Sequence, residues 1–362
     1  MPELIFTIVI CLYFSFLILI TIGLRKKFPR IKASELPSAT IIVAARNEEK
    51  NIGNCLDSLT KLNYPEGKLE IIIVDDLSED TTGKIIEEFI KDKPIFRKIY
   101  PDKNSELKGK VNAVATAVKS AKGEIILLTD ADCTVTSTWA GTIASYYQKG
   151  VGIVNGFTIL NNNDLFSGIQ AVDLVFLLSS AAGTINLNYP ISCIGNNMSF
   201  RKQAYLEAGG YEKLPFSVTE DFMLLKGISK LKKYKIIYPL DRNALVVSKA
   251  CADLSELIKQ KKRWGRGGFD APFGGMVIIG TAFLANMMVL LSPLFFSTVW
   301  LYLAVFKIIA DYFFLFPVHN ELGSKLRVKH FVFFQIYFIL YTVILPLILL
   351  FSRKISWKGR NY

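Results

Sequence analysis

Histidine and paired cysteines are scarce in this chain of 362 residues. Its two histidines, His319 and His330, lie in an apolar C-terminal region, so proton transfer elsewhere would have to use carboxylate, lysine, tyrosine or cysteine side chains. The five cysteines are odd in number and show no paired spacing, which argues against a disulfide framework and a cysteine-bound zinc ion. We expect them to be small buried side chains in a reducing compartment.

Sequences that bind phosphate through a backbone loop are missing as well. The chain has no Gly-x-x-x-x-Gly-Lys-Ser/Thr segment and no Gly-x-Gly-x-x-Gly after an expected strand. A phosphate ligand would therefore have to be held by a metal ion and by cationic side chains, for which Lys110 and Arg263 are candidates.

The basic residues behind the net charge of +12 are spread along the chain, and no nucleic-acid-binding motif accompanies them. We expect anionic membrane lipids rather than nucleic acid as their partner. The sequence also has no internal repeat and no low-complexity linker, and nothing in it fixes an oligomeric state.

Apolar residues are abundant, at 51% of the chain, which is more than an ordinary soluble enzyme has. They gather in runs of membrane-spanning length at Leu4 to Leu24, Met276 to Phe316 and Phe331 to Phe351. We predict an N-terminal transmembrane anchor with a basic flank in residues 1–34, a cytoplasmic domain in residues 35–273, and a C-terminal membrane region of about three helices in residues 274–362. The chain is thus expected to be a multi-pass protein of the cell membrane.

Charges beside the apolar runs predict the orientation. No basic stretch precedes the first run, which favours an uncleaved anchor over a signal peptide. Basic residues at 25–27 and 30 follow it, so the positive-inside rule places the middle domain in the cytoplasm. A hairpin that turns near Pro293 would leave the basic loop at 325–329 inside, but a third span would put the basic segment 352–360 outside, against the rule. A re-entrant segment containing Pro346 is the alternative.

Two charged residues within the second apolar run are expected to pair. Lys307 and Asp311 lie one helical turn apart, and ionisable groups in membrane helices usually face protein or each other.

The apolar stretch from Asp164 to Ile185 predicts a further helix, either against the membrane or packed under the domain.

From Ala39 onward, short β-branched runs alternate with amphipathic stretches, which is typical of an α/β fold with a mostly parallel sheet. Ligands of such sheets bind beyond the carboxyl ends of the strands. Charged residues gather at three expected strand ends, at residues 46–48, at 75–76, and at 130 and 132. We expect them to form one polar crevice.

Asp130 and Asp132 are two residues apart at a strand end, so their carboxylates should point to the same side. A divalent cation would relieve their repulsion, and carboxylate oxygens favour Mg²⁺ or Mn²⁺. Mg²⁺ typically completes its shell with phosphate and water, so the pair predicts a diphosphate ligand. A solvated turn is the alternative interpretation of an isolated Asp-x-Asp.

Several motifs in order give the chain a family resemblance. They are "AARNEE", "VDDLSEDTT", "GKVNA", "TDAD", "GNNMSFRK", "TED" and "QKKRW", which together cover residues 39–268. In these motifs the chain resembles the inverting family-two glycosyltransferases, in the membrane-bound branch that includes ceramide glucosyltransferases, hyaluronan synthases and cellulose synthases. The resemblance implies a Rossmann-like GT-A fold.

The resemblance also implies roles for individual residues. Asp75 and Asp76, with Ala45 and Glu48 nearby, match the segment that binds the nucleoside. Lys110 and Asn112 match a segment that helps to hold the nucleotide. Asp130 and Asp132 match the pair that binds the metal and the nucleotide sugar, with Asp132 as the main metal ligand. Asp221 matches the general base, and the motif that faces the diphosphate and the acceptor is matched by Gln260, Arg263 and Trp264. Without the motif, Trp264 would be interpreted as an interfacial anchor.

Some positions depart from the family pattern. Leu77 stands where many relatives have glycine after the paired aspartates, which affects the turn but leaves the acids in place. Asn197 and Met198 receive no role, and Glu220 either supports Asp221 or is a favourable charge at a helix N-terminus.

The expected activity is inverting transfer of a sugar from a nucleotide-diphosphate sugar to a lipid or lipid-linked acceptor at the cytoplasmic membrane face. UDP is favoured because the nearest relatives use it. A processive polysaccharide synthase with a saccharide acceptor is the alternative, although few expected spans are available for a polymer channel. A non-catalytic membrane adaptor is disfavoured because the acids and Arg263 are intact.

Overall fold

The computed structural model describes residues 2–215, 217–295, 297–351, 356–357 and 360–361. The chain forms two compact units, which we call the sheet unit (27–159 and 193–249) and the helical unit (1–26, 160–192 and 250–362). This grouping differs from the predicted division at residues 34 and 273, because 160–192 and 250–273 group with the terminal helices. Most of the basic segment that was expected at 352–360 lies outside the described residues.

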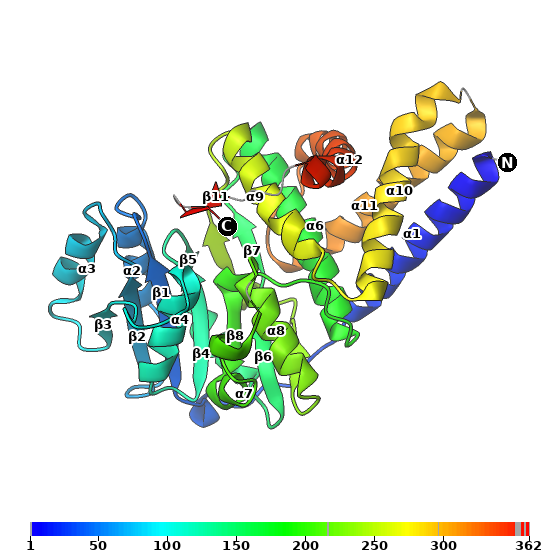
Figure 1. The fold of residues 1–362 in the computed structure, drawn as a ribbon. Helices are drawn as coiled ribbons and strands as arrows, with labels where there is room; N and C mark the ends of the chain where they lie inside the picture. The colour runs from blue at the N-terminus through cyan, green and yellow to red at the C-terminus, as the bar shows by residue number, and fades with distance from the viewer. Residues whose placement is uncertain (1, 216, 296, 352–355, 358–359, 362) are drawn as a thin grey trace. The chain divides into compact units, whose positions relative to one another are not determined.

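The sheet unit is built on one seven-stranded sheet (Figure 1). Its strands, in order across the sheet, are β3 (Phe96–Ile99), β2 (Leu69–Asp75), β1 (Ala39–Ala45), β4 (Ile125–Asp130), β8 (Met198–Arg201), β6 (Val151–Asn155) and β9 (Lys235–Ile237). Only β8 runs antiparallel to its neighbours among these pairings. The predicted mostly parallel sheet is therefore confirmed.

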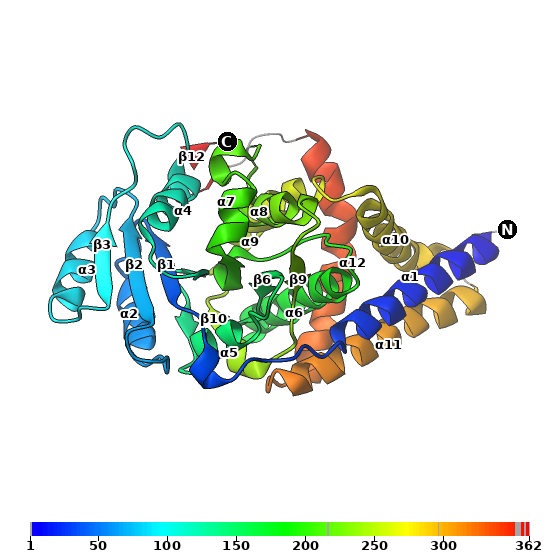
Figure 2. The same cartoon turned by 90° about the horizontal axis from the view of Figure 1, so that it is seen from below.

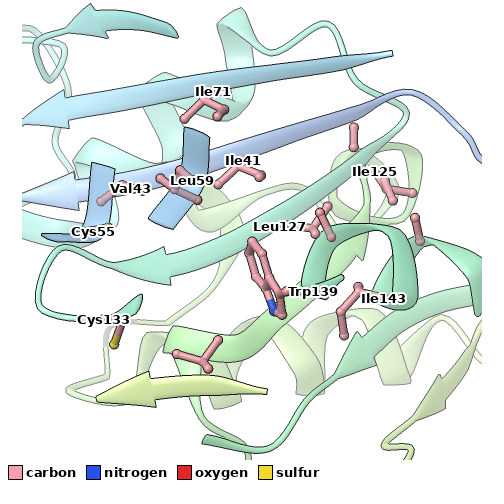
Figure 3. Close-up of a cluster of buried hydrophobic side chains, with 14 of the residues drawn as sticks. Ile41, Val43, Cys55, Leu59, Ile71, Ile125, Leu127, Cys133, Trp139 and Ile143 are labelled. Carbon is pink, nitrogen blue, oxygen red and sulfur yellow. The ribbon is translucent and has the colours of Figure 1, made fainter. Parts of the chain in front are cut away.

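Helices cover both faces because the central strands are apolar on both sides. The helices of this unit are α2 (Ile52–Thr60), α3 (Thr82–Ile90), α4 (Gly109–Ser120), α5 (Trp139–Ser145), α7 (Lys202–Glu207) and α8 (Glu220–Lys230). Figure 3 shows Ile41, Leu127 and Ile71 on one face, near Leu59 of α2 and Trp139 of α5. Each such buried aliphatic side chain contributes about 1.5–3 kcal/mol to folding.

A small second sheet contains β5 (Thr134–Val135), β10 (Val246–Ser248) and β7 (Thr158–Leu160), in that order. β5 begins four residues after the end of β4 and pairs antiparallel with β10, with Thr134 opposite Val247. The short turn between β4 and β5 is therefore fixed by a sheet on each side.

The helical unit contains the apolar runs. Its helices are α1 (Pro2–Leu24), α6 (Leu165–Asn186), α9 (Leu254–Gly268), α10 (Phe273–Leu291), α11 (Thr298–Glu321) and α12 (Val328–Phe351). All except α9 are long and apolar enough to cross a membrane. Figure 2 shows α1 and α11 side by side. The predicted turn near Pro293 is confirmed, whereas Pro346 lies within the continuous helix α12.

A buried polar network joins three of these helices. The Lys307 ammonium lies 2.8 Å from the Asp311 carboxylate, which confirms the predicted pair. Tyr13 of α1 donates a hydrogen bond of 2.7 Å to one Asp311 oxygen, and Gln335 of α12 donates one of 2.9 Å to the other. The partners satisfy charges that would otherwise be costly in an apolar interior.

Candidate functional site

The strand ends that carry the charged residues are neighbours in the sheet. β1 lies between β2 and β4, with Ala45 opposite Asp75 and Ala44 opposite Asp130. Because these strands are parallel, their carboxyl ends meet at one edge. The predicted gathering of acids at this edge is therefore confirmed.

The turn after β2 fixes Asp75 and Asp76, both of which are buried. One Asp75 oxygen accepts a hydrogen bond of 3.0 Å from the Ser78 amide, and the other lies 3.2 Å from the Lys98 ammonium. The Asp76 amide donates to the Ala45 carbonyl at 2.8 Å. Leu77 has a φ of 57°, which is strained for a residue with a Cβ, so glycine would fit this position without strain.

The loop after β1 is tied to this turn. Arg46 donates to the Asp76 carbonyl at 3.0 Å, and the Glu48 amide donates to the Thr82 hydroxyl at 2.7 Å. The Glu48 carboxylate is buried and accepts a hydrogen bond of 2.7 Å from Asn51. Glu48 is thus held at the start of α3, the helix that follows the turn with the paired aspartates.

Lys110 connects two acids from different elements. Its ammonium lies 2.5 Å from Asp130 and 3.6 Å from Glu220, the first residue of α8. Burial lowers the pKa of Lys110, but the charges of Asp130 and Glu220 outweigh this effect and raise the pKa above its ordinary value. Lys110 therefore remains a cation at neutral pH. The side chain of Asn112, two residues further along α4, instead donates to the Asp102 carbonyl at 2.9 Å.

Asp132 lies in the turn between β4 and β5. The Cys133 thiol donates a hydrogen bond of 3.3 Å to its Oδ1. Within the described ranges, no three His, Cys, Asp or Glu side chains are grouped as metal ligands. The Asp130 and Asp132 carboxylates nevertheless fit a hard divalent cation that keeps water and phosphate oxygens in its shell.

Asp221 is the second residue of α8, at an end that favours negative charge. The 3₁₀ turn Gly195–Asn197 lies against it, since a Cβ on Gly195 would be 3.1 Å from its Oδ2. The sequence suggested Glu220 only as a support or a helix-end charge, and its contact with Lys110 was not predicted. That contact joins residues 110 positions apart, for which the local pattern carries no signal.

Gln260, Arg263 and Trp264 lie on α9 of the helical unit and are half-buried. The helix begins where the Asp253 carboxylate accepts a hydrogen bond of 2.8 Å from the Glu256 amide. Lys261, inside the motif, is buried and paired with Asp173 of α6, and its ammonium lies 4.7 Å from the centre of the Trp264 ring.

The mostly parallel sheet with acids at the carboxyl ends of neighbouring strands has the arrangement of the GT-A fold. The chain belongs to the family described as "Glycosyl transferase family group 2", whose model matches residues 125–352, and the model of "Glycosyl transferase family 2" matches residues 40–209.

Two curated relatives agree with this family, and one solved structure has the same fold. The chain is 30% identical over 276 residues to the poly-beta-1,6-N-acetyl-D-glucosamine synthase of Staphylococcus aureus (strain COL), covering 74% of this chain and 63% of the relative. It is 26% identical over 248 residues to the probable glycosyltransferase YdaM of Bacillus subtilis (strain 168), covering 66% of this chain and 57% of that relative. It thus spans less than two thirds of each relative. The mannosyltransferase PcManGT from Pyrobaculum calidifontis has the same fold, with a TM-score of 0.64 at 18% identity over 98% of this chain and 100% of that one.

Proposed function

We propose that this glycosyltransferase transfers a sugar, with inversion, from a nucleotide-diphosphate sugar to a lipid or lipid-linked acceptor at the cytoplasmic membrane face. The observation that carries the proposal is the meeting of Asp130, Lys110 and Glu220 at the sheet edge that also holds Asp75 and Asp76. This edge offers acids for nucleoside hydroxyls and for a cation.

The donor is the first part of the proposal. Ala45, Glu48, Asp75 and Asp76 would hold the nucleoside, with UDP favoured, and Lys110 and Asn112 would help to hold the nucleotide. Asp132, with Asp130, would bind Mg²⁺ or Mn²⁺, which supplies positive charge to the leaving diphosphate. The PcManGT structure was solved with GDP-Man and Mn²⁺, which supports a nucleotide sugar and a metal in this fold.

The transfer step needs a proton acceptor for the attacking hydroxyl. Asp221 takes this role, and attack from the face opposite the leaving diphosphate converts an α-linked donor into a β-linked product. Arg263 would add positive charge for the diphosphate, Trp264 would offer an apolar face to the acceptor, and Gln260 belongs to the same motif.

Membrane attachment supports a lipid acceptor. Five described helices are apolar enough to cross a membrane, and the basic residues after α1 favour a cytoplasmic sheet unit with anionic lipids as its partners. A processive polysaccharide synthase is the second candidate, and it is favoured by the 30% identity to a poly-beta-1,6-N-acetyl-D-glucosamine synthase.

The test is to incubate the purified full chain with Mg²⁺ or Mn²⁺, a membrane lipid extract and a panel of nucleotide sugars. We expect release of a nucleoside diphosphate and a lipid heavier by one sugar, and loss of both in Asp221→Asn. A long polymer from one donor would favour the synthase, and no release from any donor would contradict the proposal.

A further inference from the structure

A chain of hydrogen bonds ends on the Asp132 carboxylate. Thr158 donates to the side-chain carbonyl of Asn196 at 2.7 Å, the Asn196 amide nitrogen donates to the Cys133 sulfur at 3.6 Å, and the Cys133 thiol donates to Asp132 Oδ1 at 3.3 Å. The Ser248 hydroxyl also contacts this thiol. Each donor in the chain points toward Asp132.

The chain is built into the interior. Thr158 and Cys133 are fully buried at 0% exposure, and Asn196 is buried at 8%. Rotating any of these side chains would leave a buried polar atom without its partner, which costs about 1–3 kcal/mol. The chain therefore has one preferred arrangement.

Its members come from elements that are fixed independently. Cys133 lies in the turn between β4 and β5, and Figure 3 shows its sulfur beside the apolar cluster. Thr158 begins β7, and Asn196 lies in the 3₁₀ turn that precedes β8. The neighbouring Asn197 donates to the Phe157 and Ala244 carbonyls at 2.7 and 2.9 Å, which anchors that turn.

We infer that Cys133 is a positioning residue for the cation, because its thiol, backed by Asn196 and Thr158, orients the Asp132 carboxylate. Outer partners that hydrogen-bond a metal ligand fix its direction, and their loss typically weakens metal binding by about 10–100-fold. A thiol is a weak donor, so we expect an effect near the lower end of this range. The inference rests on the proposed function, which assigns the cation to Asp132.

The experiment measures Mn²⁺ binding to the purified full chain in detergent by electron paramagnetic resonance, without any sugar donor. Cys133→Ala is expected to bind Mn²⁺ about 10-fold more weakly than the wild type. Cys133→Ser retains a donor and should recover most of the affinity. Cys55→Ala is the matched control, since this buried thiol donates to the Asp130 backbone carbonyl at 3.6 Å and not to a side-chain carboxylate oxygen, and its loss should leave Mn²⁺ affinity unchanged.

Asn196→Ala is the second variant, and it also serves if Cys133→Ala does not fold. We expect it to bind Mn²⁺ more weakly than the wild type but more tightly than Cys133→Ala, because the Cys133 thiol stays in place and loses only the amide that hydrogen-bonds to it. Unchanged Mn²⁺ affinity in the folded variants, even with slower sugar transfer, would show that Cys133 is only a core side chain and would overturn the inference alone. A wild-type chain that does not bind Mn²⁺ would overturn the inference together with the metal part of the proposed function. Sugar transfer without added metal would show separately that the metal part of the proposed function is wrong.

Discussion

At the scale of single residues, the candidate base depends on a glycine beside it. An alanine methyl at Gly195 would lie 3.1 Å from Asp221 Oδ2 and 3.3 Å from its Cβ, so the carboxylate would have to shift by a few tenths of an ångström. Small displacements of a reacting group slow catalysis, since about 1 Å can cost 100-fold. We expect Gly195→Ala to lower kcat by about 10-fold with little change in the KM for the donor.

The matched control for this variant is Gly53→Ala. Gly53 lies in α2, and nothing surrounds the place of its missing methyl within 4 Å. Alanine is a better helix former than glycine by about 1 kcal/mol, so Gly53→Ala should raise Tm slightly and leave kcat unchanged. Equal kcat values for Gly195→Ala and the wild type would contradict the proposed role of Asp221.

The sequence predicted the site residues that carry a local signal. Asp75, Asp76 and Asp130 stand directly at strand ends, where the alternation of apolar runs and charges marks them. Two other contacts of the site could not be predicted, because Lys110 meets Glu220, and Cys133 meets Asn196, only after distant segments fold together. The two members of each pair are far apart in the sequence, so no local pattern predicts that they meet.

At the scale of elements, the motif helix α9 is held on α6 by one buried ion pair. Lys261 and Asp173 are 5% and 2% exposed, and the Lys261 ammonium also lies 4.9 Å from the centre of the Tyr341 ring of α12. Removing one member leaves a buried charge without its partner, which costs about 3–5 kcal/mol, whereas replacing both by apolar residues is often neutral. We expect Asp173→Asn to lower Tm clearly and Asp173→Leu/Lys261→Met to restore most of the loss.

An exposed pair provides the comparison. Lys84 and Glu88 are 3.9 Å apart on α3 with side chains 75% and 70% exposed, so Glu88→Gln should change Tm very little. Thermal unfolding of the detergent-solubilised chain, followed by circular dichroism, measures all these variants. If Asp173→Asn and Glu88→Gln had the same Tm, the buried pair would not be what holds α9.

The elements themselves were largely predictable, because β-branched strands and long apolar helices have strong periodic signals. The position of α6 was not. Its sequence is apolar on all sides, and the sequence left open whether it lies against the membrane or under the domain. In the structure it packs within the helical unit, where Phe176 contacts the rings of Phe314 and Phe338 and Asn186 donates to the Gly23 carbonyl at 3.1 Å.

At the scale of the whole molecule, the path of the chain limits how many helices cross the membrane. Strand β6 precedes α6 in the chain and strand β8 follows it. Asn155 of β6 pairs with Met198 of β8, so the segments on both sides of α6 belong to one sheet. A crossing by α6 would require residues 187–194 to return through lipid, but eight residues reach at most roughly 29 Å when fully extended, less than the roughly 30 Å hydrocarbon core. Extended backbone in lipid would also lack hydrogen-bond partners.

Four crossings, by α1, α10, α11 and α12, therefore fit the chain better than five. They place the basic residues after α1 and the basic loop before α12 on the same side, as the positive-inside rule requires. Ser297, in the turn between α10 and α11, donates a hydrogen bond to Glu3 at the start of α1. This turn and the start of α1 therefore lie on the side of the membrane opposite to the basic segments.

This topology predicts a labelling pattern in intact cells, in a background where the exposed Cys11 is replaced by serine. Cysteines at the exposed positions Asn163 and Tyr189, which flank α6, should react with a membrane-impermeant maleimide only after the cells are permeabilised. A cysteine at Leu294, which is 71% exposed, should react in intact cells. If the cysteine at 189 reacted in intact cells while that at 163 did not, α6 would cross the membrane, and one sheet could not then contain both of its flanks.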